Sequence, residues 1–163
     1  MAVTDYFLKI DGIDGESKDS KHSNEIEVLA FNFGAHQTGS SRVGGGGGAG
    51  KVSMQDFHFT MRACKATPKL MLACANGEHI KNATMIARKA GKQQQEYLKI
   101  KFTDILVSSY STGGSGHGDI PVPLDQISLN FTKIELEYKE QNADGTLGGP
   151  IPMWWNVKEN QGG

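Results

Sequence analysis

The sequence has little cysteine: Cys64 and Cys74 are the only two in 163 residues, and no pair of CxxC motifs occurs. Two cysteines are too few for a disulfide framework, and their spacing does not match a structural zinc site. We interpret both as buried thiols in a reducing compartment, because free cysteine most often behaves as a small apolar side chain.

Long hydrophobic runs are also missing. No apolar stretch approaches the roughly 20 residues that are needed to span a bilayer, and the start of the chain lacks a basic segment followed by an apolar one. We therefore predict no membrane insertion and no ordinary signal peptide. The hydrophobic content of 37% is enough for a single core, so we expect one domain over residues 1–163.

The chain has no excess of basic charge. Its net charge of −1 argues against a nucleic-acid partner, which requires a basic surface to displace counterions from phosphates. The charge is nevertheless uneven along the chain: −3 over residues 1–50, +7 over residues 51–101 and −5 over residues 102–163. Such blocks occur on ordinary surfaces, and they also favour head-to-tail association between identical copies.

Motifs for catalysis or cofactor binding are absent as well. There is no GxSxG motif, and the five histidines lack HExxH spacing. The run Gly45–Lys51 matches GxxxxGK, but Val52 stands where a phosphate-binding loop needs Ser or Thr, and the residues that follow alternate as a strand. We predict that the protein is not an enzyme and holds no cofactor or metal.

Alternation of apolar and polar residues is the dominant pattern, and it indicates half-buried strands. It predicts strands at Tyr6–Ile10, Ile26–Phe33, Val52–Met61, Thr84–Arg88, Leu98–Val107, Ile127–Tyr138 and Trp154–Val157. In four of these the alternation changes parity midway, which is typical of β-bulges or bends that curl a sheet into a barrel. Contact with a neighbouring subunit on the outer face would break the alternation in the same way.

One helix and two loops complete the predicted fold. Thr67 is a candidate cap for a helix over Thr67–Asn76, Pro68 suits its first turn, and Gly77 suits a left-handed residue after its end. Its apolar face would contain Leu70, Met71, Ala73 and Cys74 and would close one mouth of the barrel. Glycine-rich loops are expected at 34–50 and 108–118. The predicted class is mainly β, a small antiparallel β-barrel with one flanking α-helix and a long extended Gly-rich loop.

Several sequence blocks together resemble the haemolysin-coregulated proteins. The blocks are Gly15–Asp19, Glu25–Gly34, Gly44–Lys51, Thr67–Met71, Ile86–Gly91, Ile105–Ser109, Ser111–Gly114, Leu129–Phe131 and Trp155–Asn156. The resemblance covers nearly the whole chain. It implies a tail-tube subunit of the type VI secretion system, in which six copies form a ring and rings stack into a tube.

The resemblance also implies partners and a location. The partners would be further copies of the chain, a spike protein, a contractile sheath and effector proteins in the channel. The protein would lie in the bacterial cytoplasm before firing and then be secreted, without a signal peptide, into the extracellular space or a target cell. Two alternatives remain open: a secreted effector, for which the few residues after about position 158 leave no catalytic domain, and a non-assembling chaperone that binds effectors.

Within this framework we assign candidate site residues. Leu29, Phe31 and Phe33 are expected to face the core, and Ala30 and Asn32 to face away and line the channel. Trp154 and Trp155 should divide between core and interface, because adjacent strand residues point to opposite faces. The ring-stacking loop would comprise Gly39, Ser40, Ser41, Arg42, Gly44, Gly45, Gly46, Gly47, Gly48 and Gly50.

Overall fold

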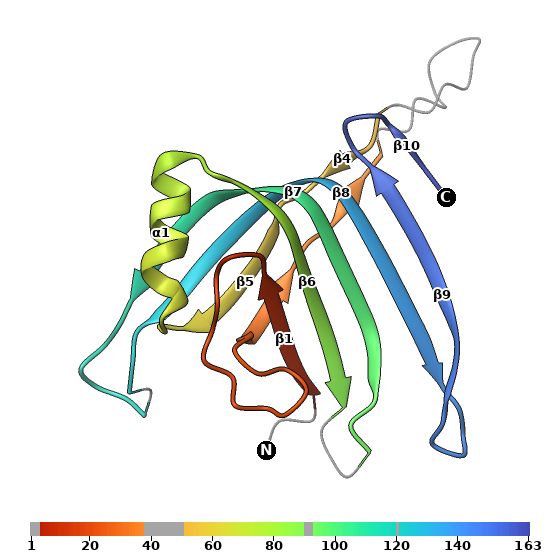
Figure 1. Ribbon diagram of the computed structural model, residues 1–163, viewed down its shortest axis with the longest axis horizontal. Coiled ribbons are helices and arrows are strands. Elements are labelled where there is room, and N and C mark those ends of the chain that lie inside the picture. The colour runs from red at the N-terminus through yellow and green to blue at the C-terminus, as the bar shows by residue number, and fades with distance from the viewer. Residues whose placement is uncertain (1–3, 38–50, 90–92, 120) are drawn as a thin grey trace.

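A computed structural model describes residues 4–37, 51–89, 93–119 and 121–163 (Figure 1). The element order is β1 (Thr4–Ile10), β2 (Ile26–Asn32), β3 (Ala35–His36), β4 (Ser53–Met54), β5 (Phe57–Arg62), α1 (Ala66–Asn76), β6 (His79–Lys89), β7 (Glu96–Gly113), β8 (Leu124–Gln141), β9 (Leu147–Asn156) and β10 (Gln161–Gly162). The proposed loop residues between positions 39 and 50 lie outside these described ranges.

Six antiparallel strands close into a barrel. Their order is β8-β5-β2-β1-β6-β7, and β7 pairs back with β8. Strand β9 lies outside this ring: it pairs with the second half of β8, and β10 pairs with the end of β9. Figure 1 shows β9 at the side of the molecule opposite α1. The predicted class, a mainly β antiparallel barrel with one helix, is confirmed.

The barrel interior is filled by alternate apolar side chains of all six strands. Phe57, Phe59 and Phe102 are among its fully buried side chains, and the ring centroids of Phe57 and Phe102 are 4.7 Å apart. Burial of such large rings is a main source of folding free energy, on the order of 2–3 kcal/mol each. The apolar half of the alternation seen in the sequence therefore forms the core.

The helix packs beside β7 at one end of the barrel (Figure 1). Its buried residues are Ala66, Leu70 and Ala73, which belong to the core cluster. Gly77 ends the helix in the left-handed conformation at φ 68°, as predicted, and its N–H donates to the carbonyl of Ala73.

Three details of the predicted helix were wrong. Met71 is exposed, because the inner face follows the row Ala66, Leu70 and Ala73 and position 71 lies outside this row. The N-cap is Lys65, which makes no side-chain capping bond, and the Thr67 hydroxyl instead accepts from the N–H of Cys64 and donates to Asp125 Oδ2. Cys74 on the helix, predicted as a buried thiol, is free and half-buried against the core, and the same holds for Cys64 before the helix.

Several strand boundaries also differ from those predicted. The expected strand Val52–Met61 is two strands, because β4 pairs with β3 in a separate small sheet while β5 joins the barrel. Strand β7 continues to Gly113, so half of the expected loop at 108–118 is extended and paired with β8. These residues are polar and exposed on one face, and no local pattern distinguishes them from a loop.

The parity change in the middle of β7 is a bend at Asp104. This residue has φ 54°, and the pairing of β7 with both β6 and β8 keeps its register past it. The side chains on either side of the bend, Phe102 and Ile105, both point into the core. A left-handed residue is uncommon outside glycine but is tolerated by Asp.

Candidate functional site: a polar recess on the outer face of the barrel

A β-bulge in β2 sets the outward face of that strand. Val28 pairs with Met61 and Ala30 with Thr60, so Leu29 is the extra residue. Leu29 is therefore 39% exposed, and the prediction that it faces the core was wrong. After the bulge, Phe31 packs against the core.

Ala30 and Asn32 point away from the core, as predicted, and both are exposed. Asn32 lies opposite His58 of β5 in the ladder, just as Ala30 lies opposite Thr60. Phe33, beyond the end of the strand, is half-buried against the core. The alternation after the parity change therefore gave the correct orientation for residues 30–33.

A second bulge acts in the same way on β7. Val107 pairs with Leu129 and Ser109 with Ser128, which leaves Ser108 as the extra residue. Because of this bulge, Ser109 and Ser111 lie on the outward face, while Tyr110 packs against the core. The sequence did not reveal this bulge, since Ser108 and Ser109 are both small polar residues and give no apolar–polar alternation from which a shift could be detected.

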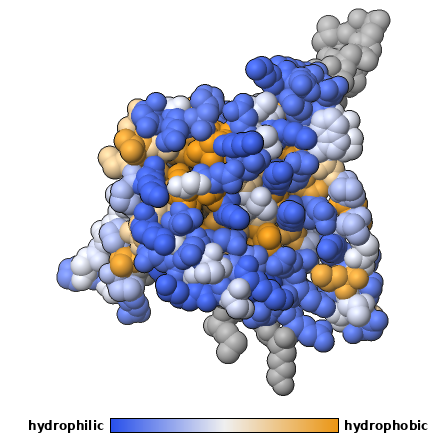
Figure 2. Space-filling model, in the orientation of Figure 1, coloured by the Kyte–Doolittle hydropathy of each residue, from blue (hydrophilic) through white to orange (hydrophobic). Residues whose placement is uncertain are grey.

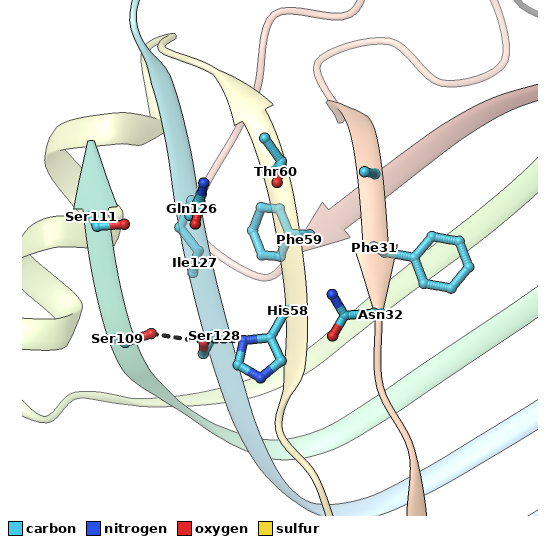
Figure 3. Close-up of a pocket in the computed structure, with 11 residues that line it drawn as sticks. Phe31, Asn32, His58, Phe59, Thr60, Ser109, Ser111, Gln126, Ile127 and Ser128 are labelled. Carbon is cyan, nitrogen blue, oxygen red and sulfur yellow. Dashed lines mark hydrogen bonds between the residues drawn. The ribbon is translucent and has the colours of Figure 1, made fainter. Parts of the chain in front are cut away.

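Strands β2, β5, β7 and β8 enclose a recess of about 420 Å³ on the outer face of the barrel (Figure 3). Its lining residues are Ala30, Phe31, Asn32, His58, Phe59, Thr60, Ser109, Ser111, Gln126, Ile127 and Ser128. None of them is Asp, Glu, Lys or Arg. The recess presents hydroxyl and amide groups, which can donate and accept hydrogen bonds without a fixed charge.

A hydrogen-bonded chain of three side chains crosses the recess. The Ser109 hydroxyl donates to Ser128 Oγ at 2.7 Å, and Ser128 Oγ lies 2.6 Å from His58 Nδ1. Ser128 is only 5% exposed although it belongs to the outward face of β8. Figure 3 shows these residues side by side, with Asn32 on the other side of His58. Sequence reasoning missed this chain, because no local motif connects positions 58, 109 and 128.

Charged side chains gather in other parts of the structure. Arg88 is only 2% exposed. Its Nη1 donates to Asp19 Oδ1 at 3.0 Å and its Nη2 donates to Asp19 Oδ2 at 2.7 Å. Nη2 also donates to Asp5 Oδ2 at 3.3 Å. The Arg88 guanidinium holds the pKa of Asp19 far below its usual range, through these hydrogen bonds. The Arg88 guanidinium also lies over the Phe7 ring, and the buried His22 ring stacks on the same phenylalanine. This cluster fastens the segment before β2 to the barrel.

Trp154 and Trp155 lie on opposite faces of β9, as alternation requires. Trp155 packs partly buried against the core, opposite Ile134. Trp154 is 37% exposed, and the Lys133 ammonium lies 5.0 Å from the centroid of its ring. The structure thus identifies Trp155 as the core residue of the pair.

An apolar strip extends from Trp155 along β8 and β9. Its three cross-strand pairs are Ile134–Trp155, Leu136–Met153 and Tyr138–Ile151. Exposure rises along the strip from buried Ile134 to Ile151, which is 63% exposed. Figure 2 shows that the surface in this view is largely hydrophilic, with hydrophobic areas near α1 and toward the β9 side. We refer to these six residues as the apolar strip.

The described parts of the chain show no sign of a metal centre or a membrane-spanning helix. Within them no three His, Cys, Asp or Glu side chains come together as metal ligands. The one helix, α1, is too short and too polar to cross a bilayer, and no other segment of the described chain is helical.

Comparison with known proteins gives a consistent result. The family model for the type VI secretion system effector Hcp matches residues 7–138. The chain is 49% identical over 162 residues to protein hcp1 of Pseudomonas aeruginosa, which covers 98% of both chains.

Solved structures agree with this match. The crystal structure of Hcp1 from Salmonella typhimurium is 40% identical, covers 99% of both chains and superimposes with a TM-score of 0.84. A type VI secretion system effector from Yersinia pestis is 38% identical over 93% of this chain and 99% of its own, with a TM-score of 0.76. The chain therefore belongs to the haemolysin-coregulated protein (Hcp) family, whose members are structural, secreted components of the type VI secretion system and not enzymes.

Proposed function

We propose that this chain is the building block of the inner tube of a type VI secretion system. Six copies form a ring, rings stack into a tube, and the tube carries effector proteins and is itself exported. In this proposal the spike protein and the contractile sheath are further partners. The chain is cytoplasmic before firing and then passes to the extracellular space or a target cell.

The observation that carries the proposal is the apolar strip on β8 and β9. In a single chain nothing in the described structure covers this face, and Tyr138, Met153 and Ile151 are each at least 40% exposed. Removal of apolar surface from water contributes roughly 25 cal/mol per Å². A second copy seated on the strip would gain this free energy, and a stable contact needs about 1,000 Å² in total.

The proposed contact uses the face of β9 and not its edge. Pro150 and Pro152 lie within β9 and have no N–H to donate to an added strand. Strand addition is therefore disfavoured, whereas face-to-face packing remains open. Six such heterologous contacts, closing at about 60° each, would form a ring.

The recess supplies the second surface that a tube subunit needs. We assign Ala30 and Asn32 to the channel wall, where small uncharged groups would let cargo bind weakly and leave. The uncharged lining of the whole recess supports this assignment. The stacking role falls to the loop that contains Arg42 and its neighbouring glycines. Trp154 lies on the opposite face of β9 from the apolar strip and would belong to a separate part of the interface.

Native mass spectrometry of the purified full chain tests this proposal. A mass near six chains, together with ring-shaped particles that have a central hole in electron micrographs, is the expected result. A monomer at every concentration would leave the non-assembling chaperone as the better explanation and would overturn the proposal.

A further inference from the structure

We propose that the recess binds carboxylate-bearing peptide segments of cargo, and that His58 makes this binding stronger as the pH falls. This inference rests on the proposed function, because it takes the recess to face the channel. Its physical basis is the position of one histidine in an otherwise uncharged lining.

The neighbours of His58 across the ladder are neutral on both sides. Asn32 lies opposite it on β2 and Ser128 on β8. Histidine is the side-chain type that ordinarily changes its charge between pH 5 and 8. Protonation of His58 would therefore convert a neutral recess into one with a single positive charge.

The hydrogen-bonded chain can accommodate either state of the ring. Ser109 donates to Ser128 Oγ, and in the neutral tautomer with its proton on Nε2 the Ser128 hydroxyl donates to His58 Nδ1 over 2.6 Å. When Nδ1 becomes protonated it donates to Ser128 Oγ, which has a second lone pair for Ser109. The Ser128 hydroxyl keeps its own proton and is then free to rotate and donate into the recess. The protonated site thus gains one more donor and loses no hydrogen bond.

The charged groups near His58 do not compete for its ring. Just before the start of β5, Asp56 accepts from the Ser108 hydroxyl at 2.6 Å and from Asn130 Nδ2 at 2.9 Å, so both of its oxygens are occupied. Arg62 lies at the far end of the strand and does not line the recess.

The strands on either side also leave the ring free. On β8 the one acidic residue beside the recess, Asp125, is fully buried in the core and accepts from Thr67. On β7 Tyr110, beside Ser109 and Ser111, turns toward the core, where burial raises its pKa. The part of β2 that lines the recess, Ala30 to Asn32, has no titratable group.

A carboxylate fits this donor set better than a polyphosphate. Each subunit offers one imidazolium together with hydroxyl and amide donors, which suits a single carboxylate held by charge-assisted hydrogen bonds. Binding of a nucleic-acid strand would require several Lys or Arg side chains along the surface, and the lining has none.

The test measures binding of a fluorescent oligoglutamate peptide by anisotropy, at about pH 8 and about pH 5.5. The full chain should bind about tenfold more tightly at the lower pH, as expected when a neutral hydrogen bond becomes a charge-assisted one. His58→Gln should remove this change, and His58→Lys should bind tightly at both pH values. His117→Gln, in the exposed β7–β8 connection, is the matched control and should behave like the unmodified chain.

The outcomes separate the two proposals. A tenfold pH effect that persists in His58→Gln, or no binding of oligoglutamate at either pH, would overturn the inference. Equal binding of an oligothymidine strand with the same dependence on His58 would overturn the assignment to acidic peptides. Native mass spectra of the same samples report on ring formation independently, so a failure of the ring proposal is recognised apart from these results.

Discussion

The Thr132 hydroxyl of β8 donates a 2.8 Å hydrogen bond to Asp104 Oδ2, at the residue where β7 bends. His79 Nδ1, on β6, lies 3.2 Å from the other oxygen of the same carboxylate. Asp104 thus links three adjacent barrel strands at one level, and its left-handed backbone lets β7 turn there without losing register. The bend depends on both the backbone and the carboxylate of this residue.

Replacement of Asp104 separates these two contributions. Asp104→Ala removes the hydrogen bonds and leaves a side chain that disfavours positive φ, so we expect a loss of about 2 kcal/mol in the free energy of unfolding. Asp104→Gly should lose about half as much, because glycine accepts the conformation. Urea unfolding measures both, and equal losses for the two variants would contradict the assigned backbone cost.

The Asp19–Arg88 pair should make stability depend on pH. Because the pKa of Asp19 is lowered in the folded protein, its contribution is fully present above about pH 4 and is lost as the pH falls below that value. Asp19→Asn should cost about 3 kcal/mol at neutral pH, since it leaves the buried guanidinium with only Asp5. The cost should shrink in acid. Thermal unfolding between about pH 7 and pH 3 measures the stability lost in Asp19→Asn at each pH, with the exposed Asp119→Asn as control. A loss that does not change with pH would refute the assigned role of the Asp19 carboxylate.

A charge at position 32 tests the channel assignment. Asn32→Arg places a fixed cation in the neutral recess and should change the retention of cargo while rings still form, because Asn32 is exposed in the single chain. Asn76→Arg, the same substitution on α1, is the control. Co-purification of effectors measures retention. Unchanged retention of every effector tested would count against a channel position for Asn32.

A charge on the apolar strip tests the proposed contact between subunits. Ile151→Lys should leave the fold within about 0.5 kcal/mol of its original stability, because the side chain is 63% exposed. The same change would bury an unpaired charge in the contact and should weaken ring formation at least tenfold, on the order of 1.4 kcal/mol. Sedimentation or native mass spectrometry measures this. The control is Leu72→Lys on α1, which changes a residue that is 59% exposed and should have little effect on ring formation. Equal losses of ring formation in the two variants would argue against the apolar strip as the contact between subunits.

The glycine-rich segment is assigned to stacking between rings. Deletion of residues 44–48 should leave rings of six chains and prevent the formation of tubes, since the deleted backbone is the proposed connection to the next ring. Electron microscopy of the two samples under tube-forming conditions measures the outcome. Tubes of normal length from the deletion variant would show that another segment makes the contact.

The sequence alone determined the class of fold and the orientation of most side chains. Alternation identified the core strands, parity changes indicated bulges or bends, and Pro68 and Gly77 marked the helix correctly near both ends. Ala30 and Asn32 were assigned to the outward face for the same reason. These features depend on local periodicity and turn chemistry, which are properties of neighbouring residues.

Only the tertiary structure decided which outward residues meet. Leu29 is exposed because the bulge falls on it and not beside it. Ser109 reaches Ser128, and through it His58, because an unrecognised bulge at Ser108 shifts the pairing of β7 with β8. The strand expected at 52–61 divides because its two halves pair with different partners. Register between strands far apart in the chain is set by the combined packing of the closed barrel, so a residue's own neighbours in sequence contain little information about it.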